Sequence, residues 1–123
     1  MRIWSPIFVL ALVLGCTSAG PPMPPADHTY TTRGVVERLE TRNDEHLLIL
    51  HEEIPDFVGI DGNPAPMHSM SMPFAVAEGV SQAGVRVGSK LEFTFEVRWE
   101  GGPPLLATRL RVLPEDAKLD LSR

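Results

Sequence analysis

The stretch KLEFTFEVRW, residues 90–99, has the most regular alternation of apolar and polar side chains in the chain. Every second residue is apolar: Leu91, Phe93, Phe95 and Val97. The residues between them are polar: Glu92, Thr94, Glu96 and Arg98. Because successive side chains of a strand point to opposite faces, this period of two predicts a β-strand with one buried face.

Four further segments carry strand-like sequence. We expect strands over residues 30–39, 45–52, 69–76 and 105–113. Gly34, inside the first of them, predicts a bulge or bend, and residues 80–83 are expected to form one helical turn. Five short strands without a long helix indicate an all-β domain over residues 29–114. A sheet this small loses its exposed edges by closing, so we predict a five-stranded, OB-like closed barrel.

The N-terminal stretch MRIWSPIFVLALVLGC has the layout of a secretory signal. It contains one basic residue, Arg2, followed by an apolar run over residues 7–14 that is too short to span a bilayer. Residues 13–16, VLGC, resemble a bacterial lipobox, which predicts a lipoprotein signal over residues 1–15 and a lipidated Cys16. The alternative is an ordinary signal peptide with an unrelated cysteine. Thr17 follows the cysteine, where an aspartate would indicate retention in the inner membrane. The resemblance therefore favours the outer membrane as the destination.

Two segments flank the predicted domain. SAGPPMPPAD, residues 18–27, holds four of the twelve prolines. We therefore expect residues 16–28, with the lipidated cysteine, to form an extended tether that holds the domain away from the membrane. The polar segment 115–123 is expected to be a flexible tail.

The charge and cysteine content exclude several classes of protein. The formal net charge is -5, and loss of Arg2 with the signal would make it -6. An acidic protein is a poor candidate for nucleic-acid binding, although Arg98, Arg109 and Arg111 could form a basic stripe on an OB-like barrel. Cys16 is the only cysteine. If it is lipidated, the domain has no disulfide and no thiolate ligand.

Two methionines, Met70 and Met72, lie one residue apart in the third predicted strand. On a strand their thioethers would stand side by side on one face. His51 ends the second predicted strand and would lie beside them if the two strands pair. One imidazole and two thioethers suit Cu(I) or Ag(I), whereas Zn(II) prefers thiolate, imidazole or carboxylate. The alternative is a core strand that happens to use methionine.

The sequence lacks the patterns of the enzymes that its histidines could indicate. HEEIP, residues 51–55, would need a second histidine at position 55 to match a zinc protease, and that position is Pro55. A blue-copper centre would need a cysteine thiolate. With no nucleophile–base pair either, we expect a binding protein rather than an enzyme.

Four segments together resemble the CusF-like periplasmic copper-binding proteins. They are RGVV (33–36), LLILHEEIP (47–55), MHSMSMPF (67–74) and GVRVGSKLEFTF (84–95). The resemblance spans about residues 30–112. It implies a small OB-like barrel that binds Cu(I) or Ag(I) through one histidine and two methionines, which fall on His51, Met70 and Met72.

The chain departs from that family in two places. The best-known members cap the ion with a tryptophan three residues before the first methionine of the pair, and this chain has Met67 there. Met67 is therefore a candidate third thioether ligand, with His68 as the alternative, while Trp99 is remote in sequence. The loop between the histidine and the methionines is also longer, mainly through VGIDGNPAP (58–66), which could form a lid or a partner surface.

These features predict a monomeric copper-binding protein on the periplasmic side of the cell envelope. It would act as a metallochaperone or buffer, in copper resistance or in copper delivery to an oxidase. The expected partners are a copper efflux pump or an oxidase-assembly protein. The alternative is a non-metal lipoprotein adaptor that docks another envelope protein through its long loop.

Overall fold

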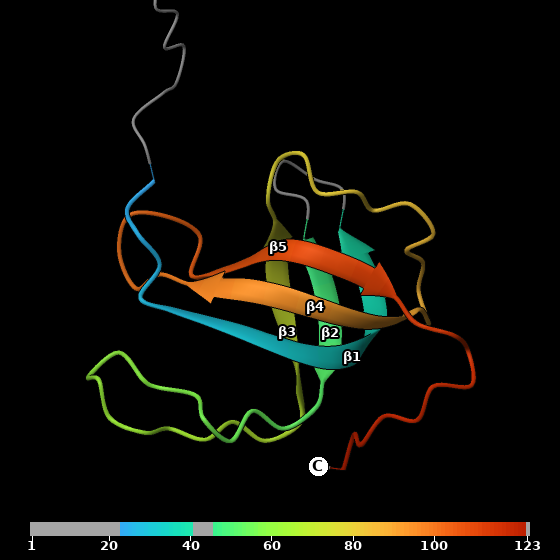
Figure 1. Ribbon diagram of the computed structural model, residues 1–123, viewed down its shortest axis with the longest axis horizontal. Helices are drawn as coiled ribbons and strands as arrows, with labels where there is room; N and C mark the ends of the chain where they lie inside the picture. The colour runs from blue at the N-terminus through green and yellow to red at the C-terminus, as the bar shows by residue number, and fades with distance from the viewer. Residues whose placement is uncertain (1–22, 41–45, 123) are drawn as a thin grey trace, which may run out of the picture.

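The computed structural model describes residues 23–40 and 46–122, which contain five β-strands (Figure 1). They are β1 (His28–Glu40), β2 (His46–His51), β3 (Met70–Val76), β4 (Lys90–Val97) and β5 (Leu105–Val112). The predicted signal peptide and Cys16 lie outside the described residues. Within the described residues, no helix is long and apolar enough to cross a membrane.

The strands form one closed barrel in the order β1-β2-β3-β5-β4, and β4 pairs back onto β1. Only the short β3–β5 contact is parallel, and the other four pairings are antiparallel. The predicted all-β, five-stranded, OB-like closed barrel is therefore confirmed. In Figure 1, β1, β4 and β5 cross in front of β2 and β3.

The alternation in β4 is the one that the sequence predicted. Its apolar residues are 0–1% exposed, and the polar residues between them are half-buried. The rings of Phe93 and Phe95 pack edge-on against Phe74 of β3, with centroids 4.9 and 5.0 Å away. These three rings lie between opposite walls of the barrel and form the centre of its core.

The connection from β3 to β4 does not contain the predicted helical turn at residues 80–83. It is a series of turns in which Gly79, Gly84 and Gly88 have φ angles of 79°, 79° and 92°. Such left-handed residues reverse the chain direction at each glycine, which prevents a helix from starting.

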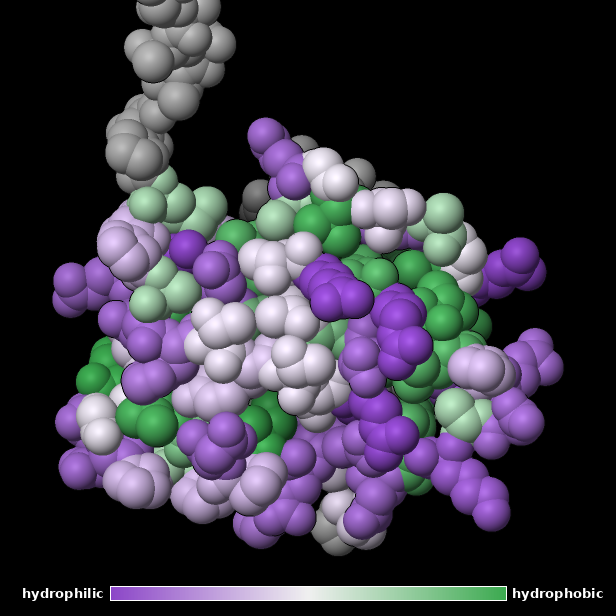
Figure 2. All heavy atoms as spheres, in the orientation of Figure 1, coloured by the Kyte–Doolittle hydropathy of each residue, from purple (hydrophilic) through white to green (hydrophobic). Residues whose placement is uncertain are grey.

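Two of the three arginines that could form a basic stripe are paired with carboxylates. Arg98 is buried, donates from Nε to the carbonyl of Pro24 (2.7 Å) and pairs with Glu96 (3.0 Å). Arg111 pairs with Glu92 across β4 and β5 at 3.3 Å. Figure 2 shows mainly hydrophilic and weakly polar side chains over this face. Arg98 and Arg111 are thus each paired with a glutamate of β4, while Arg109 is exposed.

Gly34 has a different role from the predicted bulge. The register irregularity of β1 lies between Val36 and Arg38, whereas Gly34 pairs with both His51 of β2 and Leu91 of β4. A Cβ atom on Gly34 would lie 2.5 Å from the carbonyl oxygen of Leu50. Glycine is therefore needed because β2 approaches β1 closely beside His51.

Gly34→Ala is expected to lower the free energy of unfolding by about 1–3 kcal/mol, because backbone atoms of β2 must move to admit the methyl group. Urea unfolding followed by circular dichroism measures this change. Gly102→Ala is the matched control, because its Cβ would meet only flexible side-chain atoms at 3.4 Å. Equal stability of the two variants would contradict the proposed close approach.

Candidate metal centre

The β2–β3 pairing places the predicted ligands on one face. His51 lies opposite Met70, and Ile49 lies opposite Met72, in an unbroken antiparallel register. Residues directly opposite each other in such a pair point to the same side of the sheet. The expected pairing of these strands is therefore confirmed, and His51, Met70 and Met72 all share the inward face at one end of the barrel.

His51 is the best-defined group of this cluster. Its side chain is 0% exposed, and its Nδ1 atom lies 2.7 Å from the carbonyl oxygen of Glu52. Because a carbonyl only accepts, Nδ1 carries the proton and donates to it. The neutral ring then has a free electron pair on Nε2, which lies 3.2 Å from the Sδ atom of Met72. In this tautomer an imidazole nitrogen and a thioether sulfur face each other, each with a lone pair.

Burial keeps this imidazole uncharged. Desolvation lowers the pKa of His51 below its usual 6.5, and the hydrogen bond to the Glu52 carbonyl opposes that effect only in part. The ring of Phe74 stands edge-on to His51 with centroids 6.3 Å apart, which contributes to the apolar surroundings. A neutral imidazole at neutral pH is the form that binds metal.

The methionines near this buried nitrogen differ in their exposure to solvent. Met72 is half-buried and packs against the core, while Met70 is 41% exposed at the start of β3. Met67 is half-buried, and its backbone pairs with Ile54 through hydrogen bonds of 2.8 and 2.9 Å. That bridge continues the hairpin past the ends of both strands. His68 is exposed.

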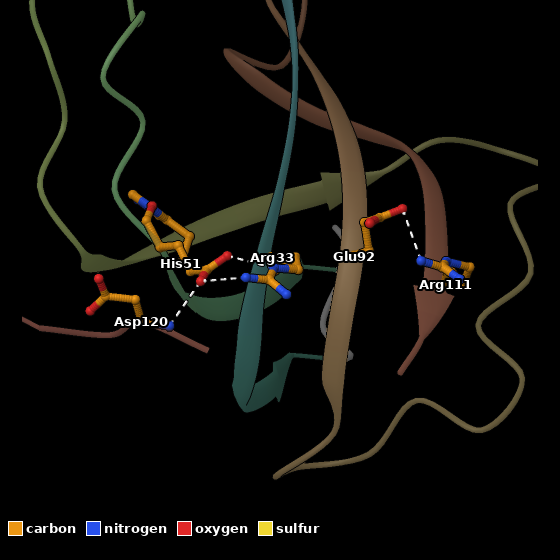
Figure 3. A network of polar contacts seen from close by, with 6 residues as sticks. Arg33, His51, Glu92, Arg111 and Asp120 are labelled. Atoms are coloured by element: carbon orange, nitrogen blue, oxygen red, sulfur yellow. Dashed lines mark hydrogen bonds and ion pairs between the residues drawn. The ribbon is translucent and has the colours of Figure 1, made fainter. Parts of the chain in front are cut away.

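Glu52, the residue after His51, is half-buried and has several hydrogen-bond partners. Its carboxylate accepts from Nε and Nη2 of Arg33 at 2.7 and 3.0 Å, and from the backbone N–H of Asp120 at 2.8 Å. Figure 3 shows Arg33 and Asp120 converging on one carboxylate beside His51. The hydrogen bond and charge of Glu52 raise the pKa of Arg33. The neighbouring Glu53 is exposed.

The long loop between His51 and the methionines is anchored by aromatic residues. Phe57 is buried, with ring centroids 5.1 Å from Tyr30 and 6.4 Å from Trp99. The N–H of Val58 donates to the hydroxyl of Tyr30 at 2.9 Å. Trp99 thus packs against this loop, whereas the ring partner of His51 is Phe74.

The donor set is one of nitrogen and sulfur. Among residues 23–40 and 46–122, no three His, Cys, Asp or Glu side chains converge in a way that could hold a metal ion. The atoms that do converge are an imidazole nitrogen and a thioether sulfur, with further thioethers along the same hairpin. Such neutral, soft donors suit a monovalent ion of the copper group.

Solved structures with the same fold include the copper- and silver-bound forms of one protein. Apo-CusF from Escherichia coli is 18% identical, with a TM-score of 0.54 over 71% of this chain and 89% of that one. Ag(I)CusF is 17% identical, with a TM-score of 0.50 over 70% and 99%. A tryptophan-to-alanine variant of E. coli CusF with Cu(II) is 18% identical, with a TM-score of 0.51 over 75% and 100%. No family model and no curated protein matches the sequence. The fold is therefore CusF-like.

Proposed function

We propose that this protein binds one Cu(I) or Ag(I) ion through His51, Met70 and Met72, with Met67 as a further thioether ligand. The observation that carries the proposal is the 3.2 Å distance from Nε2 of His51 to the sulfur of Met72. Nε2 is the nitrogen left without a proton when Nδ1 of the neutral ring donates to the Glu52 carbonyl. Two facing electron pairs repel each other unless a cation lies between them. The CusF-like fold, with Ag(I) and Cu(II) forms of CusF itself, supports the choice of ion.

The ligands favour storage or transfer of the ion over catalysis. Imidazole and thioethers are neutral, so they stabilise the monovalent ion without adding charge to the buried end of the barrel. The increasing exposure from His51 to Met70 gives the ion a path to solvent. We infer that the protein is a metallochaperone or buffer rather than an enzyme, and that it hands the ion to an efflux pump or an oxidase-assembly protein.

Titration of the purified full-length chain with Cu(I) under anaerobic conditions tests this proposal. We expect one ion per chain, and a competing chelator then gives the affinity. Met70→Ala or Met72→Ala should weaken binding about 10-fold or more at every pH, because a thioether does not titrate, and Met67→Ala should weaken it less. Failure of the wild type to bind stoichiometrically would favour the non-metal adaptor instead.

We also propose that the protein acts on the periplasmic side of the envelope and is anchored through Cys16. The support is the lipobox at residues 13–16 and the proline-rich segment after it. Two lipid chains or more are needed for stable anchoring, which lipoprotein processing supplies.

Cys16→Ser is expected to abolish lipid attachment and to move the protein from the membrane fraction to the soluble fraction. Metabolic labelling with a fatty acid, followed by fractionation, measures both effects. Thr17→Ser is the control and should remain lipidated. Wild-type protein that carries no lipid would overturn the proposed anchor.

A further inference from the structure

Every polar group of Glu52 has a hydrogen-bond partner. Its N–H donates to the carbonyl of Arg33 (2.8 Å), and its own carbonyl accepts from Nδ1 of His51 (2.7 Å). Its carboxylate accepts two hydrogen bonds from the Arg33 guanidinium and one from the N–H of Asp120. The side chain of Glu52 is only 16% exposed, so solvent screens this arrangement less than a surface ion pair.

These hydrogen bonds of Glu52 also affect His51, because the two residues are neighbours in the chain. Glu52 lies one residue beyond the end of β2. The orientation of its carbonyl therefore depends on the contacts that fix the rest of the residue. That carbonyl decides which ring nitrogen of His51 carries the proton, and thus which one is free to bind an ion.

The C-terminal segment is fastened to the barrel before it reaches Glu52. Nζ of Lys90 donates to the carbonyls of Glu115 and Ala117, both at 2.6 Å. Asp120 accepts from the N–H and hydroxyl of Ser122, which closes a turn next to its own N–H. Figure 1 shows the segment running back beneath the barrel from β5 towards the end of β2.

We propose that Arg33 and the C-terminal segment are positioning elements of the metal centre, acting through Glu52. When the segment is docked, the Asp120 N–H and the Arg33 guanidinium hold Glu52, and the Glu52 carbonyl holds His51 with Nε2 towards Met72. When the segment leaves, one of the three hydrogen bonds to the carboxylate is lost and the carbonyl is less well fixed. Affinity for the ion thus depends on the docking of residues 115–122. This inference rests on the proposed Cu(I) site.

Two pairs of variants of the full-length chain test the proposal. Arg33→Gln removes the ion pair with Glu52, and its control is Arg111→Gln, which removes the same charge from the exposed pair with Glu92. Figure 3 shows both pairs on the same barrel. Asp120→Pro removes the N–H that Glu52 accepts, whereas Asp120→Ala keeps it.

Two measurements are made on each variant at one neutral pH, after circular dichroism has shown that it is folded. In the apo protein, imidazole ¹⁵N chemical shifts report which nitrogen of His51 is protonated. Chelator competition then gives the Cu(I) affinity. Loss of such a hydrogen bond around a metal ligand costs about 10–100-fold in affinity.

We expect Arg33→Gln to weaken Cu(I) binding about 10-fold, and Asp120→Pro to weaken it several-fold, with a mixture of His51 tautomers in both. Arg111→Gln should match the wild type in both measurements. Asp120→Ala loses the turn with Ser122 but keeps the N–H to Glu52, so it should lose less affinity than Asp120→Pro. Folded Arg33→Gln and Asp120→Pro variants with wild-type tautomer and wild-type affinity would overturn the proposal. If the wild type bound no Cu(I), the proposed site would fail, and the NMR measurement on the apo protein would still decide whether Arg33 and Asp120 position His51.

Discussion

Replacement of His51 by alanine is expected to lower the Cu(I) affinity by more than about 100-fold. Loss of a residue that only hydrogen-bonds to a metal ligand already costs about 10–100-fold in affinity. The imidazole is the only nitrogen donor among the proposed ligands, and its Nε2 atom faces the sulfur of Met72. The methionines should still provide weak binding. Chelator competition under anaerobic conditions measures the difference.

The matched control is His46→Ala, because His46 begins the same strand that His51 ends. It lies opposite Ala75 rather than opposite a methionine. We expect His46→Ala to bind Cu(I) as the wild type does. Similar losses in the two variants would mean that the histidines act through the fold of β2 and not through coordination.

The pH dependence of Cu(I) binding should also depend on His51. Protons compete with the ion only below the pKa of the apo imidazole, which burial lowers from 6.5. Affinity should therefore hold from neutral pH to below 6.5 and then fall about 10-fold per pH unit, or about 1.4 kcal/mol. His51→Ala should remove most of this slope. An affinity that stayed flat below the pKa of the apo His51 imidazole, as measured by NMR, would exclude His51 as a ligand.

The lowered pKa of His51 also makes the stability of the apo protein depend on pH. Because the pKa of His51 is lower in the folded state, the unfolded chain binds more protons between that pKa and 6.5. The free energy of unfolding should therefore decrease as the pH falls from 6.5 through the folded-state pKa. Bound Cu(I) should oppose this loss, since it binds only the folded, neutral form.

Phe74→Ala is expected to lower the free energy of unfolding by about 3–5 kcal/mol. The Phe74 ring is fully buried and contacts Phe93, Phe95 and His51. Its loss leaves a cavity at the centre of a small barrel, and domains of this kind are stable by only about 5–15 kcal/mol. The urea midpoint measures this change, and the variant should also bind Cu(I) less tightly because His51 loses its packing partner.

Ile60→Ala is the control for Phe74→Ala, because Ile60 is 73% exposed on the long loop. A substitution at such a position should change stability by less than about 0.5 kcal/mol. If both variants lost similar stability, the three-phenylalanine cluster would not be the main contributor to the core.

The strands could be predicted because their pattern is local. The alternation in residues 90–97 corresponds directly to the buried and half-exposed faces of β4. The other four strands coincide with the segments that carry strand-like sequence. The number and shortness of the strands also indicated a closed barrel. The prediction of a helical turn at residues 80–83 was wrong. Gly79, Gly84 and Gly88 adopt left-handed conformations, and each of them reverses the chain before a helix can form.

The interpretations that failed concern residues whose partners lie far along the chain. Gly34 was expected to mark a bulge or bend. The register irregularity lies between Val36 and Arg38 instead, and Gly34 is needed because the backbone of β2 passes within contact distance. Arg98 was considered as part of an exposed stripe on the outer face, but it is buried and donates to the carbonyl of Pro24, 74 positions earlier in the chain. The role of Glu52 could not be predicted either, because its carboxylate is bound by Arg33 and by the backbone N–H of Asp120.

The sequence by itself determined the strand pattern and the chemistry of the proposed ligands, because periodicity and residue type are properties of neighbouring positions. It also placed Met70 and Met72 on one face. Only the tertiary structure decided which nitrogen of His51 faces Met72. The Glu52 carbonyl accepts from Nδ1 and leaves Nε2 towards Met72. The N–H of Glu52 donates to Arg33 of β1, and its carboxylate accepts from Arg33 and from the N–H of Asp120, 68 positions later. Barrel closure sets such contacts through strand register, and no local pattern records them.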